Sequence, residues 1–201
     1  MKAILIAVGV VFLLIALYLG YRYWELQQMA AKYASAKEIA AESIEKEGPK
    51  WTIHFESVIA QPIDKVWKAM HQPERSHEFM DAFKRSELKK EEGNTKTVEF
   101  DVQVLTLPIQ TFVAELTFDD AKHQMSLKTL SGPQDQTATY RLRALDADKT
   151  LLIYDATAVD RVSVPIPQGV QQSALRELFV NQIRAIQKSV AADEGKSKAA
   201  S

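Results

Sequence analysis

Apolar and polar residues alternate through much of the middle of the chain, which is the period of a half-buried β-strand. Seven such segments are separated by short turns rich in Gly, Pro, Asn and Asp. Each clear strand has one apolar and one polar face, and the second is weaker, lysine-rich and typical of an edge. The pattern predicts an antiparallel meander rather than a parallel sheet. The predicted strands are residues 51–59, 83–90, 97–104, 111–118, 125–128, 138–144 and 151–164.

Helical periodicity appears in two places. After Pro62, apolar residues spaced three and four apart predict a short helix that Pro73 ends, and a second short helix follows through Phe79. A long helix is predicted from Gln168 to Val190, with an apolar stripe along one side. The economical packing is a sheet that curls around this C-terminal helix, an α+β architecture. The stripe contains Leu175, Leu178, Phe179, Ile183, Ile186 and Val190.

The N-terminal segment has a different pattern. Residues 3–21 are uncharged, and about 20 such residues span a bilayer as a helix, so we predict a transmembrane anchor at 1–24. A cleaved signal peptide fits less well, since the apolar run is long. We place the following domain on the extracytoplasmic side of the cell membrane, although the flanking Lys and Arg count favours the cytoplasm.

Ala, Glu and Lys dominate the next stretch up to Gly48-Pro49, which predicts a helical stalk at 25–50. Residues 16–44 carry small and apolar side chains at helical spacing, so they are a candidate surface for self-association or for a membrane-protein partner. The domain then occupies 51–190, and 191–201 is predicted to be a disordered tail.

Two short motifs resemble those of a known superfamily. Ile59 to Trp67 (IAQPIDKVW) is similar to the small-residue–proline turn and following Val-Trp of the START-like (SRPBCC) superfamily, which includes polyketide cyclases/dehydrases and coenzyme-Q-binding proteins. Ser131-Gly132-Pro133 is a weaker match. The resemblance implies a helix-grip fold, with a curved antiparallel sheet of about seven strands around the C-terminal helix. It also implies a cavity between them that holds an apolar or amphipathic ligand.

Composition narrows the function classes. The 25 Lys and Arg nearly balance the 26 Asp and Glu, so no basic excess favours nucleic acid. Cys is absent, which excludes disulfides and thiolate chemistry. No nucleotide-binding, hydrolase or zincin motif occurs, and we expect no metal site and no cofactor. The four histidines are interpreted as solvated side chains: His54, His71, His77 and His123.

The predicted inner faces carry almost only apolar side chains, which suits ligand binding better than acid–base catalysis. The function predicted first is binding of a lipid, quinone or similar molecule. The alternatives are an accessory subunit with a filled cavity and, third, an aromatase/cyclase-type enzyme. Gln182 lies in the apolar stripe, either bonded to Tyr140, Tyr154 or the backbone, or orienting a ligand. The predicted cavity residues are Trp67, Phe79, Phe100, Phe112, Leu116, Tyr140, Phe179, Gln182 and Ile186.

Overall fold

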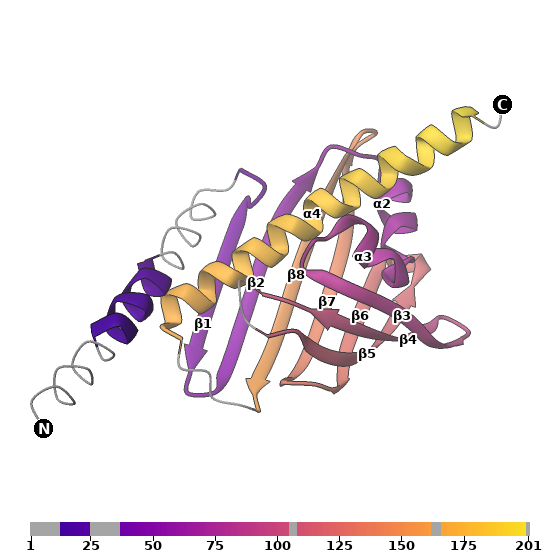
Figure 1. Cartoon of the computed structure of the whole chain (residues 1–201). Coiled ribbons are helices and arrows are strands. Elements are labelled where there is room, and N and C mark those ends of the chain that lie inside the picture. Colours follow the sequence, from indigo (N-terminus) through magenta and orange to yellow (C-terminus); the bar gives the residue numbers. More distant parts are fainter. Residues whose placement is uncertain (1–12, 25–36, 105–107, 162–165, 200–201) are drawn as a thin grey trace, which may run out of the picture.

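The computed structural model describes residues 13–24, 37–104, 108–161 and 166–199 (Figure 1). Eight strands and a long helix make up most of the domain. The strands are β1 (Ala41–Glu47), β2 (Lys50–Ile59), β3 (Phe83–Glu92), β4 (Thr95–Val102), β5 (Gln110–Asp119), β6 (Gln124–Ser131), β7 (Gln134–Asp146) and β8 (Lys149–Asp160). The helices are α2 (Ile63–Met70), α3 (Ser76–Phe79) and α4 (Gln168–Ala199), with single 3-10 turns at Pro73–Arg75 and Asp120–Lys122.

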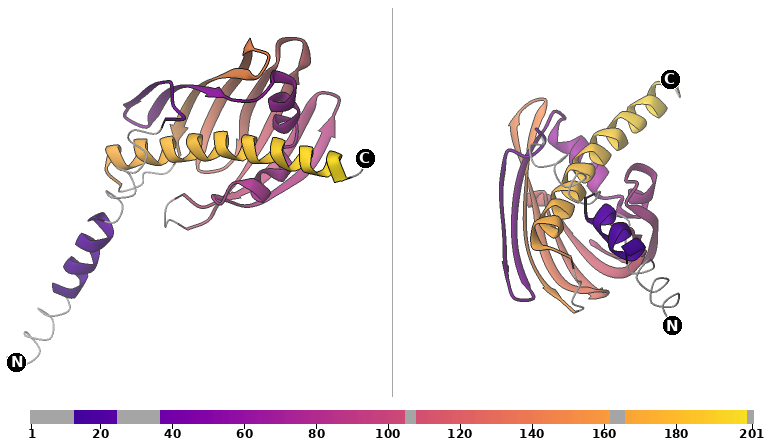
Figure 2. Two further views of the ribbon diagram at one scale, coloured as in Figure 1. Left: turned by 90° about the horizontal axis from the view of Figure 1, so that it is seen from above. Right: turned by 60° about the vertical axis from the view of Figure 1, so that its left-hand side comes forward.

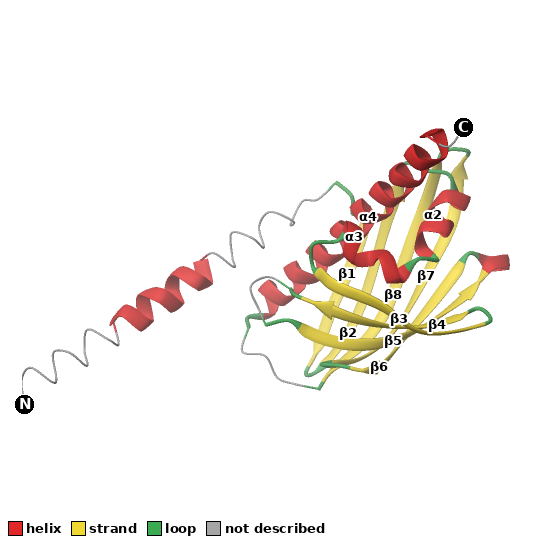
Figure 3. Ribbon diagram, turned by 45° about the vertical axis from the view of Figure 1, so that its right-hand side comes forward, coloured by secondary structure: helices red, strands yellow, loops and turns green. Residues whose placement is uncertain are grey.

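The strands form one antiparallel sheet in the order β1-β2-β8-β7-β6-β5-β4-β3. From β3 to β8 the chain is a meander, and β2 joins it beside β8. The sheet curves around α4, which lies across its concave face, while α2 and α3 connect β2 to β3 near one end of α4 (Figures 2 and 3). The predicted α+β architecture is confirmed, with eight strands rather than seven.

The core lies between the sheet and α4. Alternate residues of β2 point inward, as predicted, and Phe55 is 1% exposed. Its ring stacks on Phe179 of α4 with centroids 4.5 Å apart, which ties the sheet to the helix. Val180 and Ile183 are also fully buried on α4. The sheet and the C-terminal helix therefore share one apolar core.

The predicted helical stalk is wrong where the structure describes its C-terminal part. Residues 41–47 form β1, which pairs with β2 from Ala41↔Glu56 to Glu47↔Lys50. Gly48, in the connecting turn, has a φ of +57°, which L-residues rarely adopt. Pairing with β2 overrides the helical preference of Ala, Glu and Lys in this segment. The domain therefore includes β1 and begins before residue 51, while residues 25–36 of the predicted stalk lie outside the described residues.

The predicted membrane localisation is contradicted. Within the described residues, no helix is long and apolar enough to cross a membrane. The span predicted at 1–24 is thus not supported, nor is the single-pass placement derived from it. Residues 1–12 of that predicted span lie outside the described residues.

The C-terminal end also differs from the prediction. Helix α4 continues to Ala199, nine residues beyond Val190, where the sequence predicted a disordered tail. Asp193 in this extension accepts a hydrogen bond from Arg75 at 3.4 Å and forms an ion pair with Lys68 at 3.6 Å. These contacts join the extended end of α4 to α2 and to the turn that follows it.

Candidate functional site

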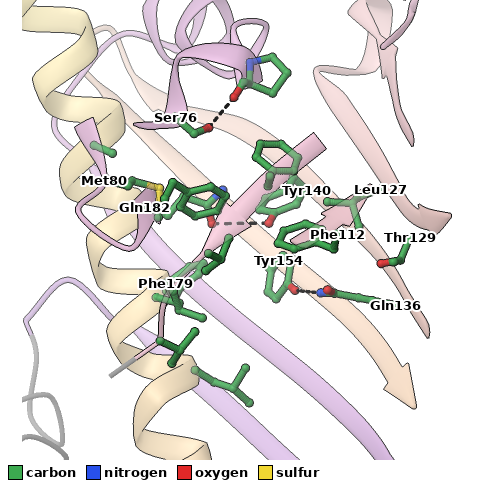
Figure 4. A pocket seen from close by; sticks show the side chains of 18 of the residues that line it. Ser76, Met80, Phe112, Leu127, Thr129, Gln136, Tyr140, Tyr154, Phe179 and Gln182 are labelled. Carbon is green, nitrogen blue, oxygen red and sulfur yellow. Dashed lines mark hydrogen bonds between the residues drawn. The ribbon is translucent and has the colours of Figure 1, made fainter. Parts of the chain in front are cut away.

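A cavity of about 500 Å³ lies between the sheet and α4. Its walls come from most strands, from α3 and from one side of α4, and a close view shows side chains from both layers facing each other (Figure 4). The volume is in the range of small-molecule sites, about 300–1,000 Å³. The aromatic side chains in its lining are Trp51, Phe55, Phe79, Phe83, Phe100, Phe112, Tyr140, Tyr154 and Phe179.

Helix α4 contributes a continuous stripe to the cavity because its lining residues recur every three or four positions. Leu175 and Leu178 are half-buried at the centre of this stripe, although they belong to an apolar face. Val180 and Ile183 lie off the stripe and are packed into the core instead. The helix thus fills the core with one set of side chains and leaves space next to another. The stripe is Gln171, Ala174, Leu175, Leu178, Phe179, Gln182, Ala185, Ile186 and Ser189.

The structure brings eight of the nine predicted cavity residues together around this space. They come from α3, β4, β5, β7 and α4, which are distant in sequence. These eight are Phe79, Phe100, Phe112, Leu116, Tyr140, Phe179, Gln182 and Ile186.

Trp67 is the exception and does not line the cavity in the described structure. Its indole nitrogen donates a hydrogen bond to Asp120 Oδ1 at 2.9 Å, in the turn between β5 and β6. A buried indole N–H needs an acceptor, and this one draws the ring away from the cavity. His71 and His123 contact the ring edge-on, with centroids 4.5 and 5.6 Å away, while 32% of each histidine side chain remains exposed.

Two hydrogen bonds between polar side chains lie in the aromatic part of the cavity (Figure 4). Gln136 Nε2 donates to the Tyr154 hydroxyl at 2.7 Å. The Tyr154 ring lies beside that of Tyr140 on the neighbouring strand, with the centroids 4.6 Å apart. The Tyr140 hydroxyl donates to Gln182 Oε1 at 3.5 Å, the long limit of a hydrogen bond. The bond from Gln182 to Tyr140, one of the two roles considered for this residue, is therefore present but weak.

Both cavity tyrosines are neutral at physiological pH. Burial raises the pKa of Tyr140 to about 12, against smaller lowering effects of the neighbouring Gln182 and Tyr154 side chains. Burial also raises the pKa of Tyr154 well above its usual 10, and the nearby Tyr140 adds to this.

One end of the cavity carries an ion pair that the sequence analysis missed. Asp160 Oδ2 accepts from Lys46 Nζ at 2.9 Å and from Trp51 Nε1 at 3.0 Å, and Oδ1 accepts from Gln134 at 2.5 Å. Lys46 also donates to Gln171 of α4 at 2.9 Å. Burial raises the pKa of Asp160, but these hydrogen bonds outweigh it and hold the pKa below its usual value.

The strand alternation contains the signal for these missed residues. Tyr154, Ala156 and Ala158 point inward on β8, and Asp160 is the next position on the same face. On β7, Gln134 and Gln136 likewise precede the inward-facing Ala138. The prediction that the inner faces carry almost only apolar side chains is thus wrong at this end of the sheet, where Asp160, Gln134 and Gln136 line the cavity.

Arg75 is the second charged residue in the described lining. Its guanidinium binds both carboxylate oxygens of Glu78 at 2.9–3.1 Å and contacts Asp193 at 3.4 Å. It also lies over the Phe79 ring, 5.1 Å from the centroid. Both charged residues of the lining are thus paired with groups of opposite charge.

No protein-family model and no curated protein matches this sequence. Solved structures do match its fold. Zhui aromatase/cyclase from Streptomyces sp. R1128 has a TM-score of 0.60 at 18% identity, covering 75% of this chain and 98% of that one. A START superfamily protein from Mycobacterium smegmatis has a TM-score of 0.59 at 15% identity, covering 70% and 97%. Ara h 8.0201 has 0.56 at 16% identity, covering 71% and 99%. The chain therefore has the helix-grip fold of START-like proteins.

Proposed function

We propose that this protein binds an apolar or amphipathic small molecule in the cavity between the sheet and α4. The observation that carries the proposal is the cavity itself, about 500 Å³ of space in the interior of the domain. Interiors normally pack to the density of organic crystals, with few voids larger than a water molecule. A space of this size, walled mainly by aromatic and aliphatic side chains, suits an apolar occupant.

The lining favours binding over chemical transformation. General acid–base catalysis needs a group that exchanges a proton near the operating pH. Tyr140 and Tyr154 have raised pKa values, and Asp160 and Arg75 are each held by several hydrogen bonds. We therefore propose a binding protein, although aromatase/cyclases share the fold, and turnover of an aromatic polyketide by the purified protein would contradict this choice.

The accessory-subunit alternative has less support. It required a cavity filled by the protein's own side chains, whereas the cavity here has space. The structure describes residues 16–24 and 37–44 of its expected docking surface, and the second stretch is engaged within the domain: Glu38 and Glu42 bind Arg184 and Arg176 of α4 at 2.6 Å. Ile39 and Ile44 pack against the core. These contacts favour a structural role for this segment.

Native mass spectrometry of the purified full chain tests the proposal. We expect a fraction of the protein to carry a bound small molecule that organic solvent extracts, and the emptied protein to take up apolar molecules. Ala174→Leu adds three carbon atoms to the cavity wall on α4 and should reduce uptake, with the fold retained.

Ala191→Leu is the matched control, since Ala191 is exposed on the same helix and does not line the cavity. Equal uptake by wild type and Ala174→Leu, or a folded protein that never takes up an apolar molecule, would overturn the proposal.

A further inference from the structure

The charged groups of the cavity are already neutralised by neighbours. Asp160 accepts from Lys46, Trp51 and Gln134, and Arg75 is held by Glu78 and Asp193. No other charged side chain belongs to the described lining. An ionised ligand would lose its hydration without gaining an unpaired counter-charge, and such a loss is expensive. The lining thus selects against ions.

Two hydrogen bonds between side chains lie beside the tyrosine rings of the cavity. Gln136 Nε2 donates to the Tyr154 hydroxyl, and the Tyr140 hydroxyl donates to Gln182 Oε1 on α4. The carbonyl oxygen of Gln182 therefore already accepts a hydrogen bond. The remaining donors are the amide protons on Gln182 Nε2, for which the described residues supply no acceptor.

Gln182 is placed to use those donors on a ligand. It is half-buried on the cavity stripe of α4, and it points at Tyr140 across the space (Figure 4). Leaving an amide donor without a hydrogen-bond partner away from water costs free energy. A ligand with an acceptor at this point should therefore bind more tightly than one without. A carbonyl oxygen is the simplest such acceptor that carries no charge.

Aromatic rings surround this point on two sides. Tyr140, Tyr154 and Phe179 lie on β7, β8 and α4, and Phe100 stacks on Phe112 at 5.1 Å on β4 and β5. Nine of the 17 aromatic residues of the chain line this one cavity. Flat rings pack against such walls in offset or edge-on contact.

We infer that the ligand is an uncharged molecule with a flat ring and a carbonyl group, whose oxygen accepts a hydrogen bond from Gln182 Nε2. This inference rests on the proposed function and adds the chemistry that the site selects. The inference also implies that the site does not favour fatty-acid anions or other carboxylates.

Three naphthalene probes of similar size test it on the full chain at neutral pH by calorimetric titration. They are 2-acetylnaphthalene, which is neutral with a carbonyl, 2-ethylnaphthalene, which has no acceptor, and 2-naphthoate, which is an anion. We expect the ketone to bind about three- to tenfold more tightly than the ethyl compound. The anion should bind at least about a hundredfold more weakly than the ketone.

A matched pair of variants assigns the effect to Gln182. Gln182→Met keeps the length of the side chain without its donors, and should remove the preference for the ketone over 2-ethylnaphthalene. Gln187→Met makes the same change on α4 at a residue outside the lining and should leave all three affinities unchanged.

The outcomes separate this inference from the proposed function. If 2-ethylnaphthalene binds as tightly as the ketone, if 2-naphthoate binds as tightly as either, or if Gln182→Met keeps the ketone preference, the inference is wrong while the binding function stands. If none of the three probes binds, and uptake of other apolar molecules is also absent, the proposed function fails as well. The wild-type comparison does not depend on how well either variant folds.

Discussion

The indole N–H of Trp51 donates a hydrogen bond to the carboxylate of Asp160 at 3.0 Å, and the same oxygen accepts from Lys46. Trp51 begins the inward face of β2, and Asp160 ends that of β8, so the bond joins two neighbouring strands at one end of the cavity. Lys46 lies on β1 and also binds Gln171 of α4. The Asp160 carboxylate thus joins β8 to β1, β2 and β7, and Lys46 extends these contacts to α4.

Asp160→Asn removes the charge and should lower the free energy of unfolding by about 1–3 kcal/mol at neutral pH, since Lys46 then has no partner charge among the described residues. The native pKa of Asp160 lies below the usual 3.8, so its stabilisation is complete above that value and disappears as the pH falls through the lowered native pKa. Urea denaturation of wild type and variant at pH 7 and pH 3 should show the gap narrowing in acid.

Asp135→Asn is the control for this measurement, because Asp135 pairs with Arg161 at the exposed surface. It should have a smaller effect than Asp160→Asn at neutral pH. An equal loss for Asp160→Asn at both pH values would show that its charge does not stabilise the fold.

Most of the fold was predictable from the sequence because its signal is local. Alternation predicted β2 and the strands from β3 to β8, and 3–4 spacing predicted α2 and α4. β1 was not predictable in this way. Its Ala, Glu and Lys residues favour a helix in isolation, and only pairing with β2 makes it a strand.

The candidate site was predictable where the apolar face of a strand or helix determines which residues point inward. Alternation and helical spacing placed eight residues on such faces, but they do not reveal whether an inward side chain lines the cavity or packs in the core. Trp67 lies on the buried face of α2 and is directed to Asp120 by a hydrogen bond across 53 residues of sequence. Asp160 follows the alternation of β8, but only its hydrogen bonds with Lys46 and Trp51, which come from two other strands, place its carboxylate at the end of the cavity.

A truncation tests whether β1 belongs to the domain. A chain of residues 37–201 keeps β1, whereas a chain of residues 51–201 loses it and exposes the edge of β2. We expect the shorter chain to lose roughly 2–4 kcal/mol of stability, since Ile39 and Ile44 contribute about 1 kcal/mol each when half-buried, and the strand contacts add to this. Denaturation midpoints of the two chains provide the measurement, and equal midpoints would refute the structural role of β1.

Gly132 should not tolerate a side chain. Its φ is +144°, and a Cβ atom would lie 2.6 Å from Cβ of Phe112 in the cavity wall. We expect Gly132→Ala to lower the free energy of unfolding by about 1–3 kcal/mol and to displace Phe112.

Gly169→Ala is the control, since Gly169 lies in the first turn of α4 with open space around it. This variant should be neutral or stabilising by up to about 1 kcal/mol. Thermal unfolding of both variants checks this, and similar midpoints would contradict the steric argument.

Trp67 separates stability from ligand binding. Trp67→Phe keeps a buried ring but loses the hydrogen bond to Asp120, so stability should fall by about 1 kcal/mol while uptake of apolar molecules stays the same. Phe179→Leu, in the cavity wall and stacked on Phe55, should reduce both. Wild type and Trp67→Phe are compared at temperatures at which the two proteins are equally stable. Weaker uptake by Trp67→Phe under these conditions would show that Trp67 contributes to ligand binding.

The raised pKa values of Tyr140 and Tyr154 predict the behaviour of the protein in alkali. The native state keeps both phenols neutral, to about pH 12 for Tyr140, whereas unfolded tyrosines ionise near 10. Ionisation of these two tyrosines therefore does not change the free energy of unfolding below pH 10, and lowers it as the pH rises from 10 through their native pKa values. Absorbance titration at the phenolate band should show two tyrosines that ionise only with unfolding, and Tyr140→Phe should leave one. Ionisation of all tyrosines near pH 10 in the folded protein would show that this part of the cavity is open to water.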